Sequence, residues 1–286
     1  MATPSPLGFI GLGVMGEPMC RNLARKSGRS VVAWDPRQEP LDRLVADGVA
    51  AARSLEEVAG KAEIVFLSLP GEKEIREVSR QLRNNVVVDC STAPVSLAKQ
   101  LSREIADFAD APVARTRQAA IDGTLSIMVG ASEALFARIE PLLRCMASDV
   151  THCGPPGAGQ AVKLLNNMVL SVTVMALAEA LAVAKASGAV DPRLLFETLM
   201  KGSADSFALR NHGMKALLPE THPEHAFPVT YMMKDVGYAL DLARSAGLDL
   251  LGASSAMELL TKTKQLGLGE AYHTAIIEAI RKRRAP

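Results

Sequence analysis

The stretch that decides the fold is an apolar run followed by three spaced glycines, Leu7-Gly8-Phe9-Ile10-Gly11-Leu12-Gly13-Val14-Met15-Gly16. The apolar run predicts a strand, and residues 17–26 predict the helix that follows it. Between a strand and a helix, each glycine of Gly-x-Gly-x-x-Gly has its own use. The first permits the tight turn, the second lets a pyrophosphate approach the backbone, and the third lets helix and strand pack closely. The stretch therefore predicts a dinucleotide-binding unit whose helix N-terminus faces the phosphates.

The cofactor-binding residues predicted at this turn are Gly11, Leu12, Gly13, Val14, Met15 and Gly16. Residues 31–34 predict the second strand, which ends at Asp35, about 20 residues after the last glycine, where an acid is expected to bond the adenosine ribose. A carboxylate there would repel a 2′-phosphate, which favours NAD. Arg37 keeps NADP possible because a guanidinium can hold a phosphate. The alternative for Asp35 is a turn residue, since Asp-Pro commonly starts turns.

Two further strands are predicted at residues 63–69 and 86–88, and both end in turn-forming residues. In an open parallel sheet, ligands lie beyond the carboxyl ends of the strands. Leu69 and Pro70 are therefore predicted to contact the cofactor, and Ser91 and Thr92 to line the site. Ser91 and Thr92 can equally cap the helix that starts near Pro94.

The chain changes character near residue 157, because strands alternate with helices before it and only helices are predicted after it. From Met168 to Ala184 the only charged residue is Glu179, so this part of a long central helix must be buried in a core or against a second subunit. The run is shorter than the roughly 20 residues that span a bilayer. We predict a Rossmann α/β domain at 1–156, with a mostly parallel, doubly wound sheet, and an all-helical domain at 157–286.

Within the second half, helices are predicted from periodicity and from the stop and start signals around Gly188 and Asp191-Pro192. The predicted helices are residues 194–200, 227–242, 252–265 and 271–282, with a loop containing short helical turns at 201–225 and a solvated basic tail at 281–284.

The charge balance excludes several classes of partner. With 32 basic and 31 acidic side chains, the net charge of +1 offers no bulk attraction to nucleic acid or to an anionic membrane. The four cysteines form no CxxC pair, and no signal segment opens the chain, so we expect reduced thiols in a cytoplasmic protein. The histidines are scattered and no metal-ligand spacing occurs, so no metal is predicted.

Lys163 and Asn167 are the strongest catalytic candidates. Their i, i+4 spacing puts both side chains on one face of the helix that starts near Gly157. The alternative is a lysine that extends to solvent and a locally bonded asparagine. Upstream, a loop carries Arg115 and Thr116, which can present donors to an anion, whereas Arg117 is interpreted as a surface arginine.

These motifs, in this order, resemble the β-hydroxyacid dehydrogenase family, typified by 3-hydroxyisobutyrate dehydrogenase and tartronate semialdehyde reductase. The resemblance covers nearly the whole chain. It rests on the glycine turn, on Asp89-Cys90-Ser91-Thr92, on Asp110-Ala111-Pro112-Val113 with Gly123-Thr124-Leu125, on Gly157-Ala158-Gly159 with Lys163 and Asn167, and on Lys234-Asp235. It implies that Lys163 is the catalytic lysine and Asn167 orients the substrate. It also implies that Thr92 borders the nicotinamide and that Lys234 reaches the same cleft, contacting both substrate and cofactor.

One departure from the family pattern concerns the substrate. Where the family usually shows Ser-Gly-Gly, this chain has Ala114, Arg115 and Thr116, which looks like the variant of sulfolactaldehyde reductases in the family. These three residues are predicted to bind a substrate that carries a sulfonate, or a carboxylate on a longer or more polar chain.

The sequence thus predicts an NAD-dependent oxidoreductase that transfers a hydride reversibly between nicotinamide and a small anionic hydroxy acid or semialdehyde. Lys163 would move the proton, provided that partial burial, the helix N-terminus and Lys234 lower its pKa. A homodimer or homotetramer is expected, because the apolar helix has to be covered. The alternatives are a non-catalytic dinucleotide-binding scaffold, an imine reductase, which generally lacks the lysine, and a glyoxylate or succinic semialdehyde reductase that uses NADPH.

Overall fold

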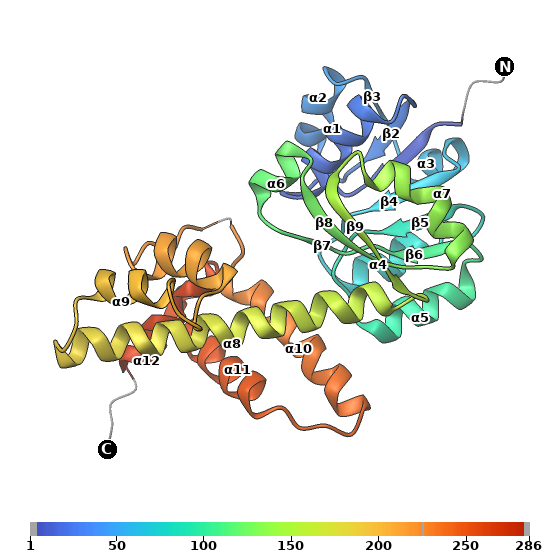
Figure 1. The fold of residues 1–286 in the computed structure, drawn as a ribbon. Helices are drawn as coiled ribbons and strands as arrows, with labels where there is room; N and C mark the ends of the chain where they lie inside the picture. The colour runs from blue at the N-terminus through green and yellow to red at the C-terminus, as the bar shows by residue number, and fades with distance from the viewer. Residues whose placement is uncertain (1–4, 225, 283–286) are drawn as a thin grey trace. The chain divides into compact units, whose positions relative to one another are not determined.

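The computed structural model describes residues 5–224 and 226–282. The chain divides into two compact units, Met1–Lys163 and Leu164–Pro286, and Figure 1 shows the ribbon of each. The division falls inside one helix, α8 (Ala158–Ser187), and the boundary predicted between residues 156 and 157 lies just ahead of that helix. That boundary stays a prediction.

The first unit is built on a sheet that has nine strands in the described part of the chain, in the order β3-β2-β1-β4-β5-β6-β8-β7, with β9 beside β8. From β3 to β6 all neighbours are parallel. This is the strand order of a dinucleotide-binding Rossmann sheet, in which the order reverses between β1 and β4. The strands are β1 (Leu7–Ile10), β2 (Val31–Trp34), β3 (Val49–Ala51), β4 (Ile64–Leu67), β5 (Val86–Asp89), β6 (Phe108–Asp110), β7 (Val113–Ala114), β8 (Leu125–Gly130) and β9 (Ala147–Gly154).

Helices cover both faces of this sheet, because successive residues of its buried strands alternate between two apolar layers. Phe9 and Phe66 belong to one layer, which also holds residues of α1, α2 and α7. Ile10 and Leu67 belong to the other, with residues of α3, α4 and α5. The helices are α1 (Gly16–Lys26), α2 (Gln38–Val45), α3 (Leu55–Lys61), α4 (Glu72–Ser79), α5 (Val95–Glu104), α6 (Arg117–Asp122) and α7 (Glu133–Leu143).

The strands, the first helix and the fold class that the sequence predicts for this unit are confirmed. The predicted strands occur as β1, β2, β4 and β5, the helix after the glycines as α1, and the Rossmann class as a mostly parallel sheet. The stretch expected to be a loop, residues 110–117, contains the end of β6, the whole of β7 and the first residue of α6. Both short strands pair antiparallel with β8.

The second unit is helical around a core of its own, which joins residues of α8, α9, α10, α11 and α12. Its helices after α8 are α9 (Pro192–Leu199), η1 (Leu209–Leu217), α10 (Val229–Ser245), α11 (Leu251–Thr263), η2 (Lys264–Leu268), η3 (His273–Ala275) and α12 (Ile276–Lys282). The predicted start of α9 is confirmed, because Asp191 caps the backbone N–H groups of Arg193 and Leu194 ahead of Pro192. Within the loop with short helical turns predicted at 201–225, the helical part is η1, which is nine residues long. Within the basic tail, residues 283 and 284 lie outside the described residues, and Arg281 pairs with Glu220 and Glu278.

The central helix α8 buries only part of its apolar surface. Val174, Ala178 and Leu181 are buried, whereas the side chains of Val169 and Val183 are 58% and 66% exposed. One face of this rod therefore lies in a core, as predicted, and the covering of its other face by a second subunit stays a prediction. By length and composition α8 could also cross a membrane, a test that core helices of globular proteins pass as well.

Candidate coenzyme and substrate site

The glycine turn between β1 and α1 leaves an open cradle for an anion. Gly11 has a φ of +92°, and a Cβ there would run into the Ser68 carbonyl, so this turn requires glycine. A Cβ on Gly13 would meet nothing within 4 Å. The start of α1 has no side-chain cap. The N–H of Glu17 already bonds to the Gly13 carbonyl and Pro18 has none, so the N–H groups open to a ligand are those of the turn just before the helix. The geometry fits the pyrophosphate of a dinucleotide.

Asp35 lies at the end of β2 and is tied to the same turn. Its carboxylate accepts the Leu12 N–H at 2.7 Å, and it also accepts the Arg37 backbone N–H at 3.0 Å and Arg37 Nε at 2.9 Å. Burial opposes its ionisation, but the hydrogen bonds from Arg37 and Leu12 outweigh burial and hold the pKa of Asp35 below its ordinary value. The carboxylate is therefore charged where the ribose of a dinucleotide would lie.

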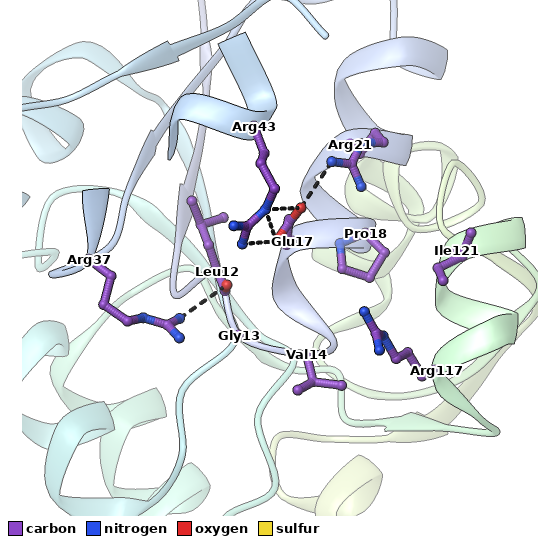
Figure 2. A pocket seen from close by; sticks show the side chains of 10 residues that line it. All are labelled: Leu12, Gly13, Val14, Glu17, Pro18, Arg21, Arg37, Arg43, Arg117 and Ile121. Carbon is purple, nitrogen blue, oxygen red and sulfur yellow. Dashed lines mark hydrogen bonds and ion pairs between the residues drawn. The ribbon is translucent and has the colours of Figure 1, made fainter. Parts of the chain in front are cut away.

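Beside the turn is a cavity of about 210 Å³, lined by Leu12, Gly13, Val14, Glu17, Pro18, Arg21, Arg37, Arg43, Arg117 and Ile121. Figure 2 shows Arg21 and Arg43 bonded to Glu17, Arg37 bonded to the Leu12 carbonyl, and Arg117 on the opposite side near Val14 and Pro18. Four guanidinium groups and the Glu17 carboxylate line the cavity. Asp47 pairs with Arg21 and Asp35 with Arg37, so a net excess of one positive charge makes this edge of the site favourable to an anion. Arg117, interpreted from sequence as a surface residue, is exposed but borders this cavity.

The ends of β4 and β5 are joined by Ser91. Its hydroxyl oxygen accepts the Leu69 N–H at 2.8 Å, and its own N–H donates to Asp89 at 3.0 Å. Ser91 is 4% exposed, while Thr92 is half-buried and Pro70 is exposed. The predicted candidates Leu69, Ser91 and Thr92 therefore come together at the carboxyl edge of the sheet, where ligands of such sheets bind.

The substrate loop places Arg115 in an unusual backbone conformation, with a φ of +87°. Its guanidinium donates to the Thr124 carbonyl at 2.6 Å, to Ser148 Oγ at 2.7 Å and to Asp149 at 2.6 Å. Thr116 caps α6 by accepting the Ala119 N–H at 3.3 Å. Ala114 is half-buried in β7. Both groups expected to bind an anion therefore have partners within the protein.

Asp110 and Gln160 anchor the start of α8. Asp110 is fully buried, and its carboxylate accepts the N–H groups of Gly157 at 2.6 Å and Gln160 at 2.7 Å. Burial raises the pKa of Asp110 to about 6, against the effect of these donors. Lys163, one turn later on α8, is 8% exposed. Sequence reasoning assigned no role to Asp110 or Gln160, although both belong to the motifs that it quoted.

The second unit contributes a polar cluster of its own. Asn167 Nδ2 donates to Asp235 Oδ2 at 2.6 Å, and Lys234 Nζ lies 3.7 Å from the other oxygen of Asp235. Lys234 also lies over the Tyr231 ring, 5.5 Å from its centroid. The structure thus brings the predicted residues Asn167 and Lys234 to one carboxylate, which sequence reasoning quoted but did not assign.

Neither metal ions nor disulfides account for this arrangement. Over residues 5–224 and 226–282, no three His, Cys, Asp or Glu side chains converge as metal ligands would. Cys20, Cys90, Cys145 and Cys153 are free thiols.

A glycine-turn Rossmann unit with a charged Asp35, followed by a helical unit, defines a dinucleotide-dependent oxidoreductase by fold and site. Two family models match the chain. Residues 6–154 match the NAD-binding domain of 6-phosphogluconate dehydrogenase, and residues 157–280 match the NAD-binding domain of NADP-dependent 3-hydroxyisobutyrate dehydrogenase.

Individual relatives agree with these models over the whole chain. The 2-(hydroxymethyl)glutarate dehydrogenase of Eubacterium barkeri is 34% identical, over 95% of this chain and 93% of its own. The 2-hydroxy-3-oxopropionate reductase of Escherichia coli K12 is 33% identical, over 96% of each. A solved structure of Mycobacterium tuberculosis 3-hydroxyisobutyrate dehydrogenase superposes with a TM-score of 0.88 at 29% identity, covering 97% of this chain and 99% of the other.

The chain therefore belongs to the β-hydroxyacid dehydrogenase family. It is an NAD(P)-dependent oxidoreductase of hydroxy acids, and the predicted family, fold and enzyme class are confirmed.

Proposed function

We propose that Lys163 is the general acid and base of this oxidoreductase and that its substrate is a small anionic hydroxy acid or the corresponding semialdehyde. The observation that carries the proposal is the burial of Lys163 in the second turn of α8. The first turn of α8 is bonded to residues 91–93 at the edge of the sheet where a nicotinamide would lie. Lysines are rarely buried, so a buried lysine at this place is a candidate for a functional role.

The bound coenzyme supplies the hydride chemistry, and this chain supplies position and a proton. Oxidation of the alcohol requires a base within hydrogen-bond reach of its oxygen, and Lys163 takes that proton. To accept it, the amine has to be neutral, and burial and a nearby helix N-terminus are the two general effects that favour a neutral amine. Asn167, one turn further on, can hold the substrate without competing for the proton, and Asp235 fixes its amide. We further propose that Thr92 borders the nicotinamide and that Lys234 takes part in substrate and coenzyme binding.

The test replaces Lys163 with methionine, which keeps the length and apolar part of the side chain. Turnover should fall about 10² to 10⁴-fold, the usual contribution of a general acid or base. Binding of the coenzyme, measured by calorimetry, should change less than about threefold, because Lys163 is not among the residues that line the cavity beside the glycine turn. Turnover near the wild-type rate would remove Lys163 from the mechanism.

The substrate class follows from the loop at residues 114–116. The named substrates of the relatives are small hydroxy or oxo acids. In this chain a guanidinium and a hydroxyl replace the small residues that the family usually has there, so Arg115 and Thr116 would take a sulfonate or a carboxylate on a longer, more polar chain. To reach it, Arg115 would exchange Asp149 for the substrate anion.

A panel of three- and four-carbon hydroxy acids, semialdehydes and sulfonates tests this proposal. Arg115→Ala should reduce kcat/KM for anionic substrates by at least about tenfold, the value of a charge-assisted hydrogen bond. Neutral aldehydes should be nearly unaffected. An equal loss for anionic and neutral substrates would contradict the role of Arg115.

Three further proposals complete the function. NAD is the preferred coenzyme because of the charged Asp35, while Arg37 leaves NADP possible. The protein works in the cytoplasm. It assembles as a homodimer or homotetramer with a second copy covering the exposed apolar side of α8, where the side chains of Leu165, Val169 and Val183 are 43%, 58% and 66% exposed.

A further inference from the structure

The side-chain amide of Gln160 brackets a single residue at the carboxyl edge of the sheet. Gln160 Nε2 donates to the carbonyl of Ser91 at 2.7 Å, and Gln160 Oε1 accepts the N–H of Ala93 at 3.0 Å. These are the two peptide groups on either side of Thr92. The amide thus pairs with the backbone as a neighbouring strand would, and Gln160 itself is fully buried.

We propose that Gln160 is a positioning residue for hydride transfer, which fixes Thr92 and Lys163 relative to one another and to the nicotinamide. The inference deepens the proposed function and rests on it. With both flanking peptides bonded, the backbone angles of Thr92 are restricted and its side chain points in one direction. Gln160 lies three residues before Lys163 on α8, so the two side chains share a face of the helix. The side chain of Gln160 therefore sets the spacing between Thr92 and Lys163.

Asp110 fixes the backbone of the same turn of α8. It holds the backbone N–H of Gln160 at 2.7 Å and that of Gly157 at 2.6 Å, so the turn that carries Gln160 cannot shift along the sheet. The carboxylate fits there because residues 130 and 159 are glycines, and a Cβ at either position would collide with Asp110. Backbone and side chain of Gln160 are thus held by two different strand ends, those of β6 and β5.

The position requires an amide for chemical reasons. The Ser91 carbonyl needs a donor, and the Ala93 N–H needs an acceptor, so only a group that has both can satisfy them together. A methionine fills the same space but leaves both peptide groups without a partner. A neutral carboxyl can satisfy both, whereas an ionised carboxylate turns an oxygen lone pair towards the Ser91 carbonyl.

The experiment compares Gln160→Met, Gln160→Glu and a matched control in the full-length enzyme. The control is Asn85→Leu, because Asn85 is also a buried amide, donating to the carbonyls of Ala59 at 2.9 Å and Ala62 at 2.7 Å. Asn85 precedes β5, so it lies at the opposite edge of the sheet from Thr92. Turnover, KM and coenzyme affinity are measured well below each variant's Tm.

Gln160→Met is expected to lower kcat about 10 to 100-fold, the effect of misplacing reacting groups by up to about 1 Å. Coenzyme affinity should change less than about threefold. Asn85→Leu should lower the Tm comparably and leave kcat within about twofold. For Gln160→Glu, the ratio of its kcat to that of the wild type should be higher at pH 6 than at pH 8, because the protonated side chain restores both hydrogen bonds.

The results separate the two levels of the proposal. If Gln160→Met keeps the wild-type kcat while Lys163→Met loses it, the positioning role is overturned and the proposed function stands. If Lys163→Met also keeps its turnover, the proposed function fails. A loss of kcat in Asn85→Leu equal to that in Gln160→Met, or a Gln160→Glu ratio that does not change with pH, would reduce Gln160 to a structural residue.

Discussion

Acidification should destabilise the helical unit through its buried histidines. His273 is 2% exposed, and neither of its ring nitrogens has a hydrogen-bond partner among the described residues. Its ring centroid lies 5.0 Å from that of His212 and 4.4 Å from that of Tyr272. Burial, with smaller effects from His212 and His222, lowers the pKa of His273 to about 3. Burial, helped by Lys215, lowers the pKa of His212 to about 4.

The sign of the effect follows from where protons bind. Well above pH 6.5, the ordinary pKa of histidine, both histidines are neutral in the folded and the unfolded chain, so they do not affect stability. Below pH 6.5 the two histidines bind protons in the unfolded chain but not in the folded chain, so lowering the pH favours unfolding. At pH 5 each of the two contributes about 2 kcal/mol of destabilisation, or about 4 kcal/mol together. That is a large part of the 5–15 kcal/mol typical of a domain.

Other groups around the cluster do not reverse this expectation. Burial also lowers the pKa of His222, with Glu278 opposing and Arg281 assisting, so His222 acts in the same direction. In the first unit Asp110 acts in the opposite direction. Its pKa of about 6 lies above that of a free carboxyl, so the folded state of that unit gains stability as pH falls from 7 to 5. The two units should therefore respond differently.

Urea unfolding at pH 7.5, 6 and 5 tests the prediction with two probes. Circular dichroism at 222 nm follows the helices of both units, and the fluorescence of Trp34, the only tryptophan of the chain, follows the first unit alone. The circular-dichroism transition that has no fluorescence counterpart therefore belongs to the helical unit. The helical transition should lose about 4 kcal/mol between pH 7.5 and pH 5. In His273→Phe, which keeps a ring but cannot take up a proton, about half of that loss should disappear. A helical transition that does not depend on pH, or a loss seen equally in His273→Phe, would refute the reasoning.

Three further predictions concern the coenzyme turn and the assembly. Gly11→Ala should lower the free energy of unfolding by at least about 1 kcal/mol in thermal melts, because φ is +92° at this position. Gly13→Ala should keep the wild-type stability and weaken coenzyme binding about tenfold or more in calorimetry. Arg37→Gln should lower the ratio of kcat/KM with NADP to that with NAD by about tenfold, through loss of a charged donor; an unchanged ratio would exclude Arg37 from phosphate binding. Val169→Asp should reduce the molar mass measured by light scattering to that of a smaller assembly; an unchanged mass would place the subunit contact elsewhere.

The sequence predicted those parts of the fold that depend on local patterns. The strand-glycine-helix turn at residues 7–26 combines an apolar run, a glycine with positive φ and a free helix N-terminus, and each can be recognised from a few neighbouring residues. The cap at Asp191 and the stop at Gly188, whose φ is +64°, are local in the same sense. The order of the parallel strands then follows from the class of fold.

The unpredicted parts depend on contacts between distant residues. The strands β3 and β9 are short or partly exposed, so no alternation distinguishes them, and only pairing with β2 and β8 holds them. The hydrogen bonds of Gln160 reach residues more than sixty positions away. No pattern of neighbouring residues distinguishes a glutamine with this role from any other glutamine at the start of an apolar helix. The sequence showed only that Gln160 lies between Gly159 and Lys163. The role of Asp110 was hidden for the same reason.

Arg115 shows how a substitution can carry information that neither sequence nor structure gives alone. Its residue type suggested an anion site, while its φ of +87° shows a backbone suited to glycine, which the family usually has at this place. An arginine in this conformation costs about 1–2 kcal/mol, and the bonds to Thr124, Ser148 and Asp149 offset that strain. Outliers of this kind gather at ligand sites, where the strain belongs to the mechanism. Because Asp149 is 55% exposed, its pair with Arg115 is weakened by solvent and can be exchanged for a substrate anion. On the proposed role of Arg115, the substrate has to supply an anion that takes the place of this carboxylate, which favours a sulfonate or a polar acid over a neutral aldehyde.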